Sequence, residues 1–129
     1  MDIRIPVPAG ELFDKIAILE IKGERIADAA KLRNVRAQLK LLREICEREM
    51  RRSAEIDRLY RALKAVNEEL WEIEDDIRDC EREKDFGARF VTLARSVYRT
   101  NDKRADIKRR IDTALGSIIV EEKSYATYE

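Results

Sequence analysis

Residues 56–80 read IDRLYRALKAVNEELWEIEDDIRDC, and their apolar residues recur alternately every three and every four positions. Eight consecutive positions of this heptad pattern are apolar without a miss: Ile56, Leu59, Leu63, Val66, Leu70, Ile73, Ile77 and Cys80. The pattern is typical of a helix that packs along one seam, as in coiled coils and helical bundles. A helix of about 30 residues is ~45 Å long, so we expect an elongated molecule.

The segments around this helix continue the same period. Apolar residues at helical spacing indicate a first helix over about 11–26, where Gly23 either ends the helix early or allows a neighbour to approach closely. A second helix is expected over about 29–52, with Asp28 as its N-cap. Lys84-Asp85-Phe86-Gly87 then interrupts the period, which indicates a tight turn between two antiparallel helices.

A second apolar stripe starts after this turn, at Phe90, and it places Thr100 and Arg104 on the seam. Two explanations are open. The helix breaks at Thr100-Asn101-Asp102, or it continues and carries a polar layer. We favour the break, because Thr, Asn and Asp are all good N-caps.

These patterns together predict one all-α domain over residues 1–129. We expect an elongated antiparallel bundle of four or five helices, dominated by a long coiled-coil-like hairpin from about Ser53 to Leu115. Apolar residues alternate with polar residues and prolines over residues 2–8, which predicts a short extended arm or edge strand. The β-branched stretch 118–120 could be extended as well and pair with this arm.

The composition excludes several classes of protein. The chain has 129 residues, with 27 Lys and Arg against 27 Asp and Glu, and it contains no histidine. A general base, a Ser–His triad or a metal site that depends on histidine is therefore excluded. A formal net charge of zero removes the usual global signature of a nucleic-acid-binding protein, although a local basic patch could remain.

The cysteines and the N-terminus indicate a protein of the cytoplasm. Cys46 and Cys80 fall on apolar stripes and lack Cys-x-x-Cys spacing, so we interpret them as small buried hydrophobic residues rather than as a redox pair. The sequence shows neither a signal peptide nor an apolar stretch long enough to span a membrane. We therefore expect a cytoplasmic protein that makes no membrane contact.

Charge is unevenly distributed along the chain. Residues 67–85 contain ten acidic and three basic residues, a net charge of −7, whereas residues 99–110 contain six basic and two acidic residues, a net charge of +4. We expect the two stretches to neutralise each other across the hairpin and to fix its register. The basic stretch could instead contact nucleic acid, but no aromatic residue is interleaved in it for base stacking.

Carboxylates in the acidic stretch raise the question of a metal site. Glu69 and Glu72, followed by Asp102 and Asp106, loosely match the paired carboxylates with which all-α nucleotide pyrophosphatases hold Mg²⁺. The second pair has the wrong spacing, and the heptad pattern turns the first pair away from the bundle interior. We therefore expect neither a metal site nor a cofactor.

A mixed polar and aromatic stripe lies beside the apolar seam of residues 56–80. It consists of Tyr60, Asn67, Trp71, Glu74 and Arg78. Packing against the first helix or against a second subunit is the simpler explanation, with Trp71 as an amphipathic anchor. In the alternative, a polar pocket is formed across the hairpin, and its candidate residues are Asn67, Trp71, Glu74, Arg78, Asn101, Asp102 and Arg104.

Four segments together resemble a known family. They are residues 10–22 (GELFDKIAILEIK), 70–78 (LWEIEDDIR), 94–105 (ARSVYRTNDKRA) and 121–125 (EEKSY). The chain resembles, over nearly its whole length, a small bacterial and bacteriophage family of uncharacterised helical proteins. The resemblance implies a single full-length domain, and it brings no activity, cofactor or catalytic residue.

Three hypotheses for the function follow. The first is a non-enzymatic protein-interaction or adaptor module without catalytic residues, which forms a homodimer or binds another protein, because the apolar seam is longer than two short helices can cover. The second is a small-molecule or phosphate-binding protein, with or without enzymatic activity, that uses the polar candidate residues. The third is a nucleic-acid contact through the basic stretch 99–110.

Overall fold

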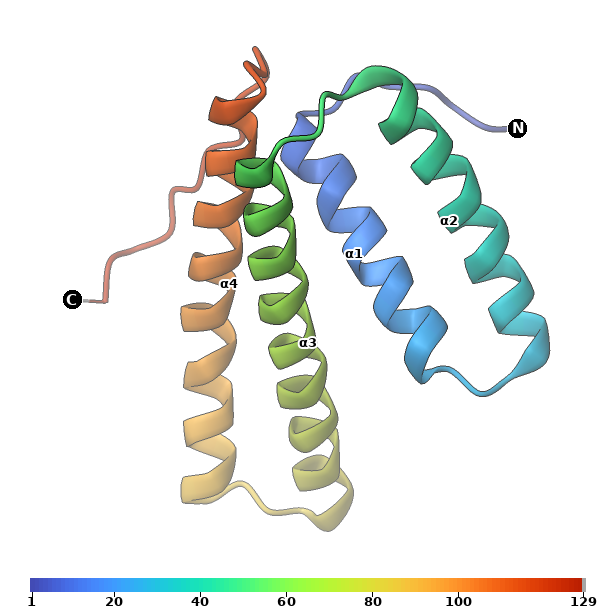
Figure 1. The fold of residues 1–129 in the computed structure, drawn as a ribbon. Helices are drawn as coiled ribbons and strands as arrows, with labels where there is room; N and C mark the ends of the chain where they lie inside the picture. Colours follow the sequence, from blue (N-terminus) through green and yellow to red (C-terminus); the bar gives the residue numbers. More distant parts are fainter. Residues whose placement is uncertain (129) are drawn as a thin grey trace.

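The computed structural model describes residues 1–128, which form four α-helices and contain no β-strand. The helices are α1 (Ala9–Arg25), α2 (Ala29–Glu49), α3 (Ala54–Glu83) and α4 (Ala88–Ala114). Figure 1 shows α3 and α4 as a long antiparallel hairpin, from which a shorter hairpin of α1 and α2 leans away. The predicted all-α fold is confirmed, as is the dominant hairpin after Ser53.

Helix α1 is the centre of the fold. It packs against the other three helices, whereas α2 packs against α1 alone. The amphipathic pattern of α1 is broad enough to bury residues on several sides of the helix at once. The main core cluster therefore draws on all four helices and contains Leu12, Phe13, Ile16, Leu19, Val35, Leu39, Cys46, Ile56, Leu63 and Ile111.

The helix ends follow local sequence signals. Asp28 caps α2 by accepting a hydrogen bond from the Lys31 N–H at 2.9 Å, and Ser53 caps α3 by accepting one from the Ile56 N–H at 3.1 Å. Lys84 takes a left-handed backbone conformation with φ of 58° and ends α3, which confirms the predicted turn.

Helix α4 is continuous through Thr100-Asn101-Asp102, so the favoured helix break is wrong. The alternative, a polar layer on the seam, is what the structure contains. Thr100 is only 3% exposed, and Arg104 reaches a buried carboxylate of α1. Because that partner satisfies the guanidinium group, the seam accommodates a charged residue without a helix break.

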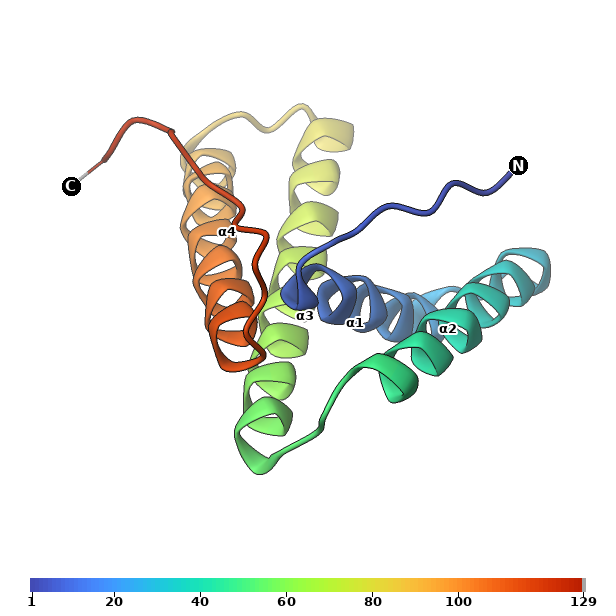
Figure 2. The same cartoon turned by 90° about the horizontal axis from the view of Figure 1, so that it is seen from above.

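The two ends of the chain have no regular structure. Residues 1–8 and the tail of residues 116–128 are neither helical nor extended in a sheet. Ile3 and Ile118 are 76% and 95% exposed, so the expected strand pairing between the arms is wrong. Figures 1 and 2 show the tail folding back beside α4, while the N-terminal arm leaves from the other side of the molecule.

The hairpin has two differently covered halves, because α1 is shorter than α3. We call residues 54–69 and 98–114 the proximal half, and residues 70–97 the distal half. Arg25 at the end of α1 pairs with Glu72 at 3.4 Å, and α3 continues well beyond that point (Figure 1). In the distal half only Ile73 and Cys80 are buried among the large apolar side chains and cysteines; the others are half-buried or exposed, namely Leu70, Trp71, Ile77, Phe86, Phe90, Val91, Leu93 and Val97.

Candidate functional site

A buried ionic cluster lies where α1, α3 and α4 meet. Asp14 of α1 is 1% exposed, and its carboxylate accepts a hydrogen bond from the Asn67 side-chain amide at 2.8 Å. Arg104 of α4 donates from its Nε to the same carboxylate at 3.0 Å, and a second guanidinium nitrogen bonds the other oxygen. This bidentate geometry is the strongest form of an Arg–carboxylate pair. The cluster therefore fixes three helices through one side chain.

Lys108 extends this cluster toward the tail. Its ammonium group lies 2.7 Å from Glu11, 3.9 Å from Asp14 and 3.3 Å from Glu121 of the tail. Burial by itself would lower the pKa of Lys108, but the hydrogen bond to Glu11 and the surrounding carboxylates outweigh it and raise that pKa. Lys108 and Arg104 are therefore permanently charged and compensated, which suits a structural tie rather than acid–base chemistry.

The start of α1 is fixed to the end of α4 by backbone donors. The Gly10 N–H donates to the Asp112 carboxylate at 2.6 Å, and the Ala9 N–H donates to the Ser117 hydroxyl at 3.0 Å. A carboxylate at a helix N-terminus is favourable for the helix dipole. A Cβ atom on Gly10 would lie 2.5 Å from the Lys108 carbonyl oxygen, so this approach requires glycine. Burial raises the pKa of Asp112.

An open groove of about 950 Å³ lies between α4 and the tail. The tail is held over it by Asp102, which accepts hydrogen bonds from Lys123 at 3.1 Å and from the Tyr128 hydroxyl at 2.8 Å. These two donors lower the pKa of Asp102. The groove is lined by Val97, Tyr98, Asn101, Asp102, Arg104, Ala105, Lys108, Glu121, Lys123, Tyr125, Ala126, Thr127 and Tyr128.

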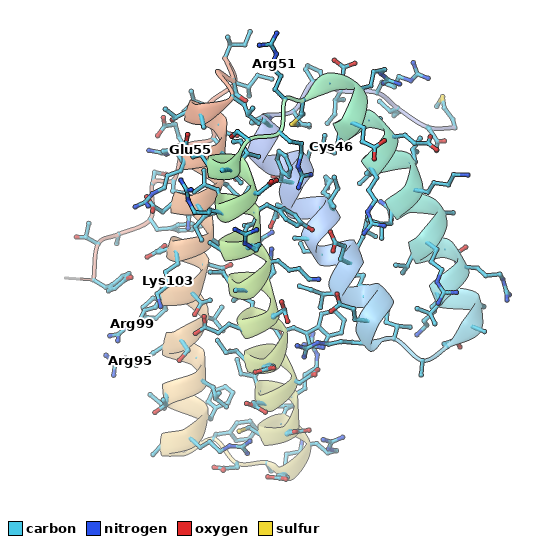
Figure 3. The ribbon with its side chains drawn as sticks, viewed as in Figure 1. Cys46, Arg51, Glu55, Arg95, Arg99 and Lys103 are labelled. Carbon is cyan, nitrogen blue, oxygen red and sulfur yellow. The ribbon has the colours of Figure 1, made fainter. Side chains whose placement is uncertain are left out.

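A row of exposed cations runs beside this groove. Arg95, Arg99 and Lys103 are four residues apart on α4, and Figure 3 shows their side chains along the outer edge of the helix, pointing away from α3. Within residues 1–128 none of the three forms an ion pair with a carboxylate. We call this row the basic ridge. The ring of Tyr98 lies 4.8 Å from that of Tyr128, and Arg95 and Arg99 lower the pKa of Tyr98.

Comparison with known protein families shows which family the chain belongs to. Residues 3–128 match the model of a family of unknown function, DUF6165. The protein is a member of this DUF6165 family. No curated protein and no solved structure matches it. The resemblance to an uncharacterised family is therefore confirmed over nearly the full chain, whereas the bacterial and bacteriophage origin stays a prediction.

The candidate polar residues of this DUF6165 chain fall in three places rather than in one pocket. Asn67 and Arg104 converge on Asp14 in the buried cluster. Asn101 and Asp102 line the groove under the tail. The other three lie in the distal half of the hairpin, where Trp71 is half-buried and the Glu74 carboxylate pairs with Arg78 at 2.9 Å on the surface.

The N-terminal part of the polar stripe of α3, Tyr60 and Asn67, packs against α1. The Tyr60 hydroxyl donates to Glu20 of α1, and its ring lies 5.8 Å from that of Phe13. Burial and the Glu20 carboxylate raise the pKa of Tyr60. Together with the bond between Asn67 and Asp14, these contacts support the simpler explanation of the stripe over the proximal half.

The expected neutralisation across the hairpin does not occur. Within residues 1–128, no ion pair joins the acidic stretch 67–85 to the basic stretch 99–110. Arg25 of α1 instead pairs with Glu68 and Glu72 of α3. In the basic stretch, the pairing partners are carboxylates of α1, of the tail and of α4 itself. Because the seam side chains separate α3 from α4, their outer faces do not meet.

Sequence reasoning did not single out Asp14, Lys108 or Lys123 as residues of the site. One available signal was the charge of Arg104 on the seam, which requires an acid on a facing helix, and Asp14 lies within the apolar pattern of α1. The tail carries no period, so nothing local places Lys123, Tyr125 and Tyr128 beside α4.

Other predicted features can be placed as well. Cys46 and Cys80 are both buried free thiols, as predicted, and burial raises the pKa of Cys46. Among the residues that the structure describes, no group of three or more His, Cys, Asp or Glu side chains could hold a metal ion. None of the four helices has the length and apolar character needed to cross a membrane.

Proposed function

We propose that this protein is a non-enzymatic protein-interaction module and that the distal half of its hairpin is the docking surface. The observation that carries the proposal is the coverage of the apolar seam. The heptad pattern continues unbroken to Cys80, yet only Ile73 and Cys80 of the distal apolar side chains are buried.

Two antiparallel helices bury only the residues between them, and they leave the flanks of the seam in contact with water. In the proximal half α1 covers one flank, which is why Leu63 and Ile111 are fully buried there. Full burial of a Leu, Ile or Phe side chain is worth about 1.5–3 kcal/mol. A helical partner that continues the line of α1 would therefore gain stability from side chains that are already aligned.

We further propose that the partner is a second copy of the chain. Distal residues 72–83 of α3 contain seven acidic and two basic residues, a net charge of −5, whereas residues 88–99 of α4 contain three basic and no acidic residues, a net charge of +3. A two-fold axis that places α3 of one copy beside α4 of the other brings opposite charges together and completes a four-helix bundle.

Sedimentation or light scattering tests this proposal. We expect a particle of twice 15.1 kDa at micromolar concentration. Leu93→Glu in the distal half should give a monomer with unchanged helix content, and its melting temperature should fall because the stabilisation from dimer formation is lost. Leu41→Glu, the same change at an exposed position of α2, should leave the dimer intact. A wild-type monomer at all concentrations, or dissociation by both variants alike, would contradict the proposal.

A further inference from the structure

We infer that the basic ridge of Arg95, Arg99 and Lys103, together with the tyrosines beside it, binds single-stranded nucleic acid. This surface lies on the face of α4 that points away from α3, so the inference goes beyond the proposed docking surface. Arg95 and Arg99 also contribute to the positive charge of residues 88–99 that the dimer proposal uses, whereas Lys103 and the two tyrosine rings do not.

The cations of the basic ridge are available, unlike most of those that follow them. Arg104, Lys108, Arg109 and Arg110 are paired with carboxylates of α1, of the tail or of α4. The basic ridge has no such partner within residues 1–128, and its members are exposed. The structure therefore places uncompensated positive charge at residues 95–103, rather than over the whole predicted stretch 99–110.

The spacing of the basic ridge suits a linear anion. Residues four apart on a helix are separated by about 6 Å along its axis, so the three cations form one straight row. A chain of phosphodiesters presents repeated negative charges to such a row. An isolated carboxylate or a small anion would use only one of the three positions.

The tail supplies the aromatic rings that the basic stretch itself lacks. Tyr128 packs on Tyr98, and the two side chains are 51% and 39% exposed. The Arg99 guanidinium lies 6.0 Å from the centre of the Tyr128 ring, so the rings belong to the same surface as the cations. Exposed aromatic rings beside cations stack unpaired bases without sequence preference. A duplex cannot offer its base faces in this way, which favours a single strand.

Because the net charge of the chain is zero, the affinity for nucleic acid has to come from the basic ridge alone. Three phosphate contacts give a salt dependence of about −2 in log K against log [salt] for a single strand, which is a weak, salt-sensitive interaction. Binding should therefore be measured at low ionic strength.

The test uses a fluorescein-labelled oligothymidine of twenty residues and fluorescence anisotropy with the full chain. Replacing Arg95, Arg99 and Lys103 by Gln should weaken binding about tenfold or more and flatten the salt dependence. Replacing Arg33, Arg36 and Lys40 of α2 by Gln removes the same charge from another exposed row, and it should change binding no more than about twofold. Tyr98→Ala should weaken binding at least about fivefold.

Four results would overturn the inference. They are no binding by the wild type at low salt, equal losses from the two triple variants, equal affinity for a duplex of the same length, and binding to vesicles containing anionic lipid but not to the oligonucleotide. Circular dichroism confirms that each variant is folded, so that a loss of binding reports on the surface itself.

Discussion

The proximal and distal halves of the hairpin share one heptad pattern but have different surroundings. In the proximal half, α1 buries the seam and adds a fully bonded polar cluster around Asp14. In the distal half, the same pattern leaves Leu70, Ile77 and Leu93 partly in water. The difference teaches that a heptad pattern identifies the residues of a seam, whereas a third helix determines how much of that seam is buried.

The largest expected difference between the two halves comes from removing the Asp14 carboxylate at the centre of the proximal half. Asp14→Ala leaves Arg104 and Asn67 without their shared partner in a buried site. We expect the free energy of unfolding to fall by about 3–5 kcal/mol in thermal or urea denaturation. Glu74→Ala, which removes an exposed ion pair of the distal half, should cost less than about 1 kcal/mol. Equal losses would show that the two halves do not differ in this way.

Two glycines of α1 provide a sharper test of how closely the proximal half is packed. Gly10→Ala places a Cβ against the backbone of α4, so we expect a loss of about 1–3 kcal/mol. Gly23→Ala meets nothing within 4 Å, although the sequence suggested a helix end or a close approach there. Since Ala favours the helix, it should stabilise the protein by about 0.5–1 kcal/mol. Chemical denaturation of both variants measures the contrast, and a gain from Gly10→Ala would refute the close approach.

The smallest effects concern two carboxyl groups on α4 whose pKa values are shifted in opposite directions. The pKa of Asp102 is lowered, so its contact with the tail is present above the usual carboxyl pKa and is lost as the pH falls through the lowered value. The pKa of Asp112 is raised, so its contribution is fully present below the usual pKa and is lost as the pH rises through the raised value. Carboxyl carbon chemical shifts measured by NMR against pH should show that Asp102 titrates at a lower pH than Asp112. Titration of both groups at the same pH would contradict this prediction.

The sequence predicted the features that depend on near neighbours. The Asp28 cap and the turn at residues 84–87 are each encoded within a few residues, and the long seam of α3 is encoded in a period that repeats every seven residues. The helix break was wrong for the same reason, because the local capping preference of Thr100-Asn101-Asp102 gave no sign of Asp14, far away in the chain. The groove likewise depends on a tail without periodicity, which only the folded chain places beside α4.

The emission of Trp71 tests the central contrast most directly, because Trp71 is the only tryptophan of the chain and lies in the distal half. If that half docks a second copy, the emission maximum should shift to shorter wavelength as the protein concentration rises from nanomolar to high micromolar. Leu93→Glu should abolish this shift, and Leu41→Glu should preserve it. An emission maximum that stays constant over the whole range would contradict the account, because it would mean that the distal half remains as open to water as it is in the single chain.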